Sequence, residues 1–204
     1  MTKLYQAVKY QDQLYYHIYN RGAHKEKIFF SEDHYLRCLN LLYKYADKYA
    51  ASIIAYCFMP NHYHLILQQK EHGSISKCLQ TTFNAYSQTV NLMVGHSGTL
   101  FQGKAKSKLI DSDEYVLQVI RYIHLNPGNA GLVQKPEDWP FSDYREWIKE
   151  IGDLPKDTAN RMVPSEGGKL RAAYFASGKE YQQFVEEYRV EQKNEKLDKF
   201  LFKE

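Results

Sequence analysis

Residues 51–69 read ASIIAYCFMPNHYHLILQQ, and this stretch decides the fold. Ala51 to Phe58 is rich in small and β-favouring residues, which predicts a strand. Met59-Pro60-Asn61 predicts a tight turn, and the eight residues from His62 to Gln69 predict a second strand. Successive side chains of a strand point to opposite faces, so His62 and His64 should lie side by side on one face of the sheet.

The segments on either side predict two more strands and two long helices. Leu14 to Asn20 predicts a strand, and Ser31 is the expected N-cap of a helix that runs to about Tyr49. Ser74 to about Val94 predicts the second helix, which Gly95 and Gly98 end. Thr99 to Ile110 contains the fourth strand. The inward stripe of the first helix is expected to be Leu36, Leu39, Tyr43 and Ala46.

A third helix should follow the fourth strand. Asp111-Ser112-Asp113-Glu114 has the D-x-x-E pattern of a capping box, which predicts the start of this helix. Its apolar stripe is Val116, Val119, Ile120 and Ile123. Pro127 disfavours a helical residue before it, so the helix should end near Leu125.

The order strand, helix, strand, strand, helix, strand is that of the split ferredoxin-like unit, an α+β fold with an antiparallel sheet. The strand with the two histidines should lie near the centre of this sheet. The two long helices should cover one face and leave the other exposed for a site. The composition changes after Trp147 and Ile148, so we expect a domain at residues 1–148. Residues 149–204 should form a linker followed by a charged helical extension.

Composition limits the cellular setting more than the function. The net charge of +3 over 204 residues is too weak by itself to indicate nucleic acid. The three cysteines are far apart and form no CxxC pair, which is typical of a reducing compartment. An apolar signal segment and a run long enough to span a bilayer are both missing, so we expect a cytoplasmic protein with no membrane partner.

Two histidines on a strand could hold a divalent metal, although such a pair alone is more often structural. A third ligand and a nucleophile would have to come from elsewhere. Tyr122 and Asn126, in the segment RYIHLNP, are at positions i and i+4 and share one helix face. A Tyr hydroxyl with a pKa of about 10 is a poor nucleophile, but a neighbouring cation favours the phenolate and polarises a phosphate. Tyr115 is the main rival and has no polar oxygen ligand at i+4.

Taken together, these motifs resemble the single-tyrosine HUH transposases, and within them most closely the REP-associated tyrosine transposases. The matching motifs are Asn20-Arg21-Gly22, Met59-Pro60-Asn61-His62-Tyr63-His64, Phe101-Gln102-Gly103, Tyr122-Ile123-His124-Leu125-Asn126-Pro127 and Trp139-Pro140-Phe141-Ser142. They occur in the expected order and extend over roughly Leu14 to Tyr144.

The resemblance implies cleavage and rejoining of single-stranded DNA beside a hairpin. It implies that His62 and His64 bind Mg²⁺ or Mn²⁺ and that Tyr122 becomes linked to a DNA 5′ end, releasing a 3′ hydroxyl. Some relatives have Gln as third ligand where Asn126, one methylene shorter, stands here. His124 should be structural or support the site indirectly. The protein would then be associated with the bacterial nucleoid, as a monomer or a homodimer.

Further DNA contacts are expected around this centre. Lys104, Lys106 and Lys108 alternate along the fourth strand and should form a phosphate-contacting ridge, unless they only protect a sheet edge. Arg21 could bind phosphate or brace its turn. His17 should pack or contact DNA rather than bind metal. The aromatic residues Tyr19, Tyr86 and Phe101 could stack on bases.

Three functions fit the sequence. The first is a metal-dependent single-strand DNA nicking and joining enzyme, that is, a DNA transposase. The second is a module that binds hairpin nucleic acid with little catalysis. The third is a nuclease that uses activated water, with Tyr122 structural.

Overall fold

The structure is a computed structural model that describes residues 9–95, 98–149 and 166–192. The chain divides into two compact units, residues 1–123 and residues 124–204. This division falls within helix α3 (Asp113–Asn129) and not at residue 148, where the composition changes. The domain boundary at residue 148 stays a prediction.

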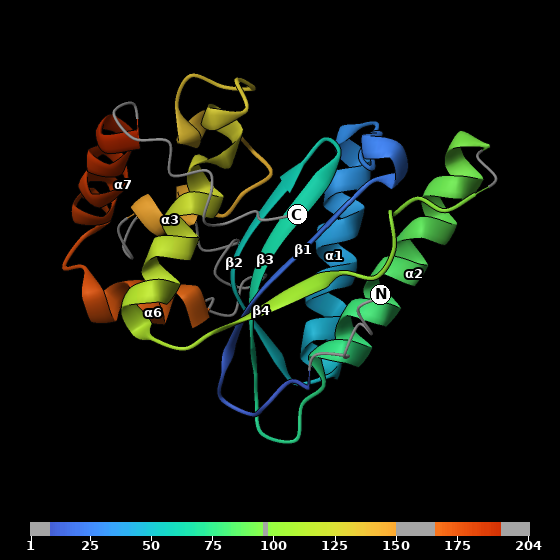
Figure 1. The fold of residues 1–204 in the computed structure, drawn as a ribbon, viewed down its shortest axis with the longest axis horizontal. Coiled ribbons are helices and arrows are strands. Elements are labelled where there is room, and N and C mark those ends of the chain that lie inside the picture. The colour runs from blue at the N-terminus through green and yellow to red at the C-terminus, as the bar shows by residue number, and fades with distance from the viewer. Residues whose placement is uncertain (1–8, 96–97, 150–165, 193–204) are drawn as a thin grey trace, which may run out of the picture. The chain divides into compact units, whose positions relative to one another are not determined.

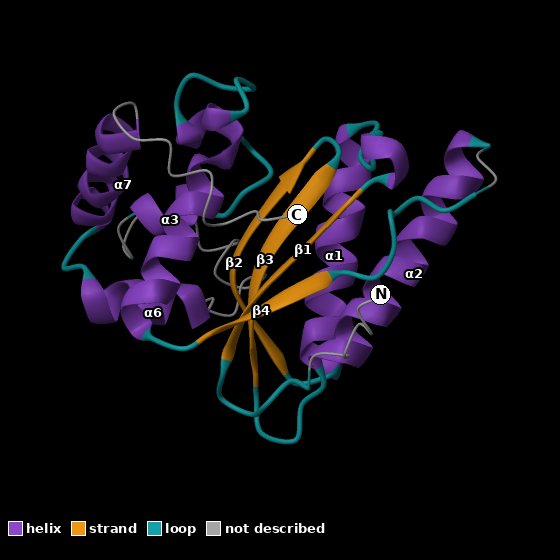
Figure 2. Cartoon of the chain, viewed as in Figure 1, coloured by secondary structure: helices purple, strands orange, loops and turns teal. Residues whose placement is uncertain are grey.

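The first unit contains one four-stranded antiparallel sheet (Figures 1 and 2). Its strands are β1 (Tyr15–Arg21), β2 (Ala51–Met59), β3 (His62–Gln69) and β4 (Lys106–Ile110). They lie in the order β2-β3-β1-β4, and every neighbouring pair is antiparallel. The predicted ferredoxin-like α+β fold is thereby confirmed, with the two histidines on an interior strand.

Helices α1 (Glu32–Lys48) and α2 (Ile75–Val94) lie on one side of this sheet (Figure 2). Tyr63 shows which face they cover, because its ring stacks on Phe83 of α2 with centroids 4.2 Å apart. Tyr63 alternates with His62 and His64, so the histidines point to the opposite face. Ser74 caps α2 by accepting a hydrogen bond from the backbone of Lys77.

One feature of helix α1 and one feature of the sheet differ from the prediction. The buried stripe of α1 consists of His34, Tyr35, Cys38, Leu42 and Ala46. The prediction that Leu36 faces inward is therefore wrong, because Leu36 is exposed and the helix is rotated by about one position. The exposed face predicted for the sheet is also wrong, because His17 and His64 on that face are buried.

The third helix begins and ends later than predicted. Ser112, not Asp111, caps α3, because its hydroxyl accepts a hydrogen bond from the backbone of Tyr115. The helix continues through Pro127 to Asn129. Pro127 removes only one donor, and the backbone N–H of Ala130 still bonds to the carbonyl of Asn126 at 2.9 Å.

One glycine in a motif is required by close packing. A Cβ on Gly22, which directly follows β1, would lie 2.1 Å from the carbonyl oxygen of Glu26. The backbone there is also fixed from two other sides. Gly22 N–H bonds to the carbonyl of Asn61 at 2.8 Å, and Ala23 N–H bonds to that of Leu100 at 3.0 Å. The end of β1 is thus held against the turn that precedes β3.

Beyond the end of α3, the elements described in the second unit are helices. It contains η2 (Pro136–Asp138), α4 (Tyr144–Ile148), α6 (Glu166–Tyr174) and α7 (Gly178–Gln192). Tyr181 and Val185 of α7 are fully buried. Most of the predicted linker lies outside the described residues.

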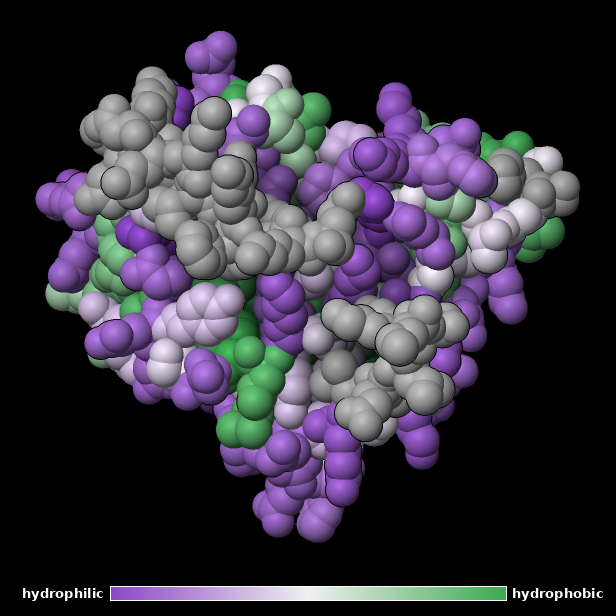
Figure 3. All heavy atoms as spheres, in the orientation of Figure 1, coloured by the Kyte–Doolittle hydropathy of each residue, from purple (hydrophilic) through white to green (hydrophobic). Residues whose placement is uncertain are grey.

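Hydrophilic side chains make up most of the described surface seen in Figure 3, and apolar residues appear there in small groups. Within residues 9–95, 98–149 and 166–192, no helix is both long enough and apolar enough to cross a membrane. The three cysteines, all within the described residues, are buried and form no disulfide.

Candidate functional site

The pairing of β1 with β3 and β4 gathers the candidate side chains on one face of the sheet. Arg21 pairs with His62, and Tyr19 pairs with His64. On the other side of β1, Tyr19 pairs with Lys106 and His17 with Lys108. Directly paired residues share a face, so the two histidines lie among basic and aromatic side chains.

The imidazoles of His62 and His64 are adjacent, with ring centroids 5.1 Å apart and planes at 87°. His62 is partly exposed, whereas His64 is only 2% exposed. The Nδ1 atom of each ring lies against a polar partner. His62 Nδ1 is 2.7 Å from the side-chain oxygen of Asn61, and His64 Nδ1 is 3.0 Å from Nε2 of His17.

Burial favours the neutral form of His17 and His64. Desolvation lowers the pKa of His64 well below its usual value, and His17 and His62 act in the same direction. Desolvation, helped by the nearby charge of Lys108, lowers the pKa of His17 to about 3. A neutral imidazole is the form that binds a metal ion, so this environment suits coordination.

Tyr122 lies against His64. Its ring and that of His64 are 5.8 Å apart and nearly perpendicular, at 87°. The side chain is 8% exposed, whereas its rival Tyr115 is 36% exposed. The structure therefore brings Tyr122, from just past the middle of α3, to His64 of β3.

The donors present fit a hard divalent cation only in part. The described residues contain no group of three or more His, Cys, Asp or Glu side chains that could hold a metal. Two neutral imidazoles would thus need a third ligand of another kind, such as an amide or phosphate oxygen. Asn126 is half-buried, one turn beyond Tyr122 along α3, in the second unit. Its role as a ligand stays a prediction.

Two motifs that are far apart in the sequence contact each other residue by residue. Gly22 forms an isolated bridge with Phe101, and the guanidinium of Arg21 bonds to the side chain of Gln102. Asn20 donates to the carbonyl of Gly103 at 2.9 Å, although the two are 83 residues apart. The Arg21 side chain is thereby held in place next to His62.

The lysine ridge is shorter than predicted. Lys106 and Lys108 alternate on β4 and share the face of the histidines. Lys104 is exposed but lies before the strand, so the prediction that it continues the alternation is wrong. The ammonium of Lys106 lies 6.0 Å from the ring centre of Tyr19. Tyr19 therefore stays a candidate for stacking on a base.

Two other stacking candidates pack against the protein itself instead. Tyr86 is fully buried, and its hydroxyl donates to the carbonyl of Ile28 at 2.6 Å. Phe101 packs edge-on against Tyr63 and Phe83, on the helix side of the sheet. Of the two roles expected for His17, packing is the one that its burial supports, because it is 3% exposed. Its side chain contacts His64 diagonally across the β1–β3 pair, and this contact depends on a register that no local pattern reveals.

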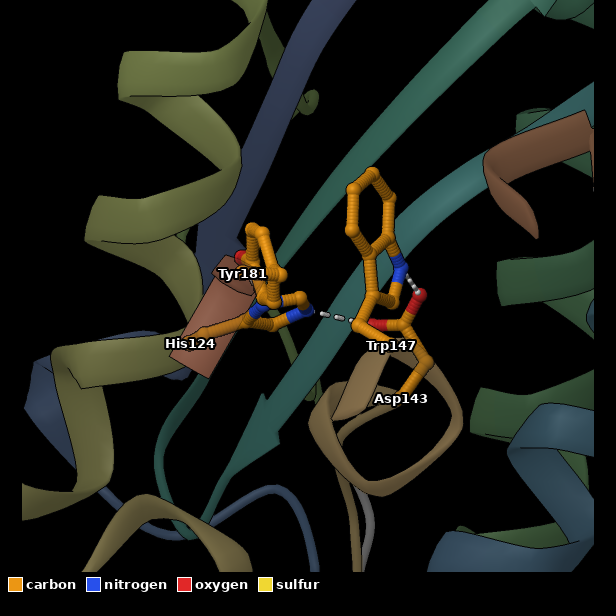
Figure 4. Close-up of polar contacts among 4 residues, drawn as sticks. All are labelled: His124, Asp143, Trp147 and Tyr181. Atoms are coloured by element: carbon orange, nitrogen blue, oxygen red, sulfur yellow. Dashed lines mark hydrogen bonds and ion pairs between the residues drawn. The ribbon is translucent and has the colours of Figure 1, made fainter. Parts of the chain in front are cut away.

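His124 belongs to a buried network in the second unit (Figure 4). Its Nδ1 lies 2.6 Å from the Tyr181 hydroxyl, and its Nε2 lies 3.0 Å from a carboxylate oxygen of Asp143. The other oxygen of Asp143 accepts from the indole N–H of Trp147 at 3.0 Å. These contacts account for His124 as a structural residue, which the sequence left open.

The ferredoxin-like sheet, the paired histidines on an interior strand and the helical tyrosine beside them define the single-tyrosine HUH class. The chain belongs to the IS200-like transposase family, whose sequence model matches residues 10–126. This match includes β1 to β4 and ends at Asn126.

Individual relatives agree with this family. A Haemophilus influenzae protein provisionally named a REP-associated tyrosine transposase is 25% identical over 113 residues, which are 50% of this chain and 64% of that protein. The chain thus matches less than two thirds of this relative. A solved structure of a REP-associated tyrosine transposase bound to a REP hairpin has a TM-score of 0.62 at 17% identity. That match covers 73% of this chain and 87% of the other, and it shows a common fold.

Proposed function

We propose that this protein is a DNA transposase that nicks and joins single-stranded DNA next to a hairpin, with Tyr122 as nucleophile. The observation that carries the proposal is the position of Tyr122, whose ring lies 5.8 Å from that of His64. Family membership and the hairpin bound by the structural relative support the kind of substrate.

The proposed step is a transesterification. The Tyr122 oxygen attacks the scissile phosphorus, and the bond from phosphorus to the 3′ oxygen breaks. The phenol loses one proton and the released 3′ oxygen gains one, so the protons balance. The DNA 5′ phosphate is then held as a phosphotyrosine ester. Attack by a second 3′ hydroxyl on this ester reverses the step and joins strands. The exchange replaces one phosphate ester by another, so it requires no nucleotide cofactor.

His62 and His64 would hold Mg²⁺ or Mn²⁺, with Asn126 as the candidate third ligand. Such an ion, when bound, polarises the phosphate and stabilises the charge that develops on it. Arg21 is positioned by Gln102 next to His62, where a guanidinium suits a phosphate oxygen. Lys106 and Lys108 extend the positive charge along the same face, which suits the adjoining DNA backbone.

A covalent adduct tests the proposal. A labelled single-stranded hairpin DNA incubated with the protein and Mn²⁺ should give an adduct that survives SDS. Tyr122→Phe should abolish both adduct and cleavage, whereas Tyr115→Phe, in the same helix, should leave them intact.

The other outcomes identify the other functions. Cleavage that persists in Tyr122→Phe would indicate a nuclease that uses water. Hairpin binding by the wild-type protein with neither cleavage nor adduct would indicate a binding module.

A further inference from the structure

Both histidines of the proposed metal site contact a polar neighbour through the same ring atom, Nδ1. Asn61 provides this neighbour for His62, and His17 provides it for His64. A metal-bound histidine usually donates its other ring N–H to such a partner, which fixes both the tautomer and the ring orientation. The repeated contact therefore raises the question of which nitrogen carries the hydrogen.

For His62, the contacts of Asn61 answer this question. The Asn61 amide nitrogen donates to the backbone carbonyl of Lys25 at 3.2 Å. This bond turns the amide oxygen toward His62, where it lies 2.7 Å from Nδ1. An oxygen can only accept, so His62 must carry its hydrogen on Nδ1, and the lone pair is on Nε2.

For His64, the partner is another buried imidazole. Nδ1 of His64 and Nε2 of His17 are 3.0 Å apart, and the rings are nearly parallel at 22°. Both residues are buried, and a hydrogen bond between two ring nitrogens at this distance requires that one nitrogen donates and the other accepts. Donation by His64 places its lone pair on Nε2, whereas donation by His17 would leave a hydrogen there.

We propose that Asn61 and His17 are positioning residues that keep His62 and His64 in the tautomer with hydrogen on Nδ1, so that Nε2 of each ring binds the metal. This inference rests on the proposed metal site. His17 is not a further ligand, because the described residues hold no cluster of three potential His, Cys, Asp or Glu ligands. Its role is to accept the His64 hydrogen.

The tautomers can be read directly in the unaltered protein. Long-range ¹H–¹⁵N NMR spectra of the metal-free wild-type chain should show a protonated Nδ1 and an unprotonated Nε2 for both His62 and His64. A hydrogen on Nε2 of His64 would overturn the inference, and this measurement depends on no variant folding correctly.

Metal affinity provides the second test, with Mn²⁺ binding followed by electron paramagnetic resonance in the absence of DNA. His17→Met removes the acceptor at similar volume and should weaken Mn²⁺ binding by about tenfold or more. His17→Gln can place an amide oxygen near the original Nε2 and should recover most of that loss. His34→Met is the matched control, because His34 is also buried but contacts the backbone of Phe30.

The outcomes separate this inference from the proposed function. If His62→Ala and His64→Ala weaken Mn²⁺ binding but His17→Met binds as the wild type does, the positioning role is wrong and the metal site stands. If His62→Ala and His64→Ala bind Mn²⁺ like the wild type, the metal site itself is wrong, and the inference fails with it. Equal losses in His17→Met and His17→Gln would also contradict the role of the acceptor.

Discussion

At the scale of single residues, Tyr122 and Asn126 lie one turn apart on the same helix, yet the structure supports their proposed roles to different degrees. The structure places Tyr122 at His64, which sequence spacing alone could not do. Asn126 follows along the same helix, and only its position in α3 supports a role as ligand. The two residues therefore need separate tests.

Asn126→Ala should raise the Mn²⁺ concentration for half-maximal cleavage by about tenfold, which corresponds to about 1.4 kcal/mol. The physical reason is the loss of one oxygen ligand from a site that has only two imidazoles. Asn126→Gln, which resembles the relatives with Gln there, should retain most of the affinity. Asn129→Ala at the end of α3 is the control, and an Asn126→Ala protein with normal Mn²⁺ dependence would assign the third ligand elsewhere.

The sequence reveals only part of this residue-scale picture. His62 and His64 share a face because strands alternate, which is a local rule that any strand obeys. The contact of His64 with His17 instead depends on the pairing of β1 with β3. A pattern read within one segment contains no information on that register.

At the scale of elements, β4 differs from its neighbours because it brings positive charge to the face of the histidines. Lys106 and Lys108 are exposed there, whereas His17 and His64 on the adjoining strands are buried. The positive charge is thus placed where a bound DNA strand could pass without entering the buried part of the site.

A double substitution of Lys106 and Lys108 by Gln should weaken DNA binding and make it less sensitive to salt. Each lost phosphate contact on single-stranded DNA reduces the slope of log K against log salt by about 0.7, so the slope should fall by about 1.4. Fluorescence anisotropy over a series of salt concentrations measures it. The same double change at Lys44 and Lys48 of α1, which packs on the opposite side of the sheet, should leave the slope unchanged. Equal slopes for both double variants would contradict a DNA-binding role for β4.

Helix α4 contains a carboxylate in an unfavourable setting. Burial, together with the nearby charge of Asp143, raises the pKa of Glu146 to about 8. The folded protein should therefore hold a proton on Glu146 between about pH 4.5 and pH 8, where the unfolded chain has lost it. Stability falls as pH rises through this window, because the unfolded state binds fewer protons there.

Glu146→Gln removes this titration and should stabilise the protein at pH 8 by about 2 kcal/mol, allowing for partial solvent screening. At pH 4.5 the substitution should have little effect. Thermal melting of both proteins at the two pH values measures the difference. An equal effect at both pH values would show that Glu146 is not protonated in the folded state.

Element boundaries show where prediction from sequence fails. Both ends of strand β3 are predicted correctly, because the turn before it and the alternation within it are both set by neighbouring residues in the sequence. Helix α3 extends past its predicted end because Pro127 itself is buried and lacks only a single donor, so the next turn still closes through the bond from Ala130 to Asn126. Tertiary packing of this kind is invisible to local propensity.

At the scale of the whole molecule, the C-terminal extension takes part in a buried core. Tyr181 of α7 is fully buried and contacts His124 of α3, which is bonded in turn to Asp143 (Figure 4). Trp147 packs on Tyr181 with ring centroids 4.8 Å apart. Removing α7 would therefore expose aromatic groups and leave buried polar atoms without partners.

A chain that ends at Ile148 should melt about 10 °C or more below the full chain, because it loses the buried side chains of Tyr181 and Val185. Its tryptophan fluorescence should shift to the red as Trp147 becomes exposed. A chain that ends at Gln192 retains these contacts and should melt like the full chain. A shortened chain with an unchanged melting temperature would show that the extension contributes nothing to the core.

The strand order β2-β3-β1-β4 has a consequence for how the site is built during folding. β1 comes first in the chain but pairs only with strands that come much later, so its two edges stay open until β3 and β4 have formed. Pairings between distant segments must overcome the entropy of closing long loops, which makes them slow. The β2–β3 hairpin can therefore form early and present His62 and His64 without their neighbours. Arg21, His17 and the lysines of β4 join them only when the sheet closes around β1, so the complete site is a late product of folding.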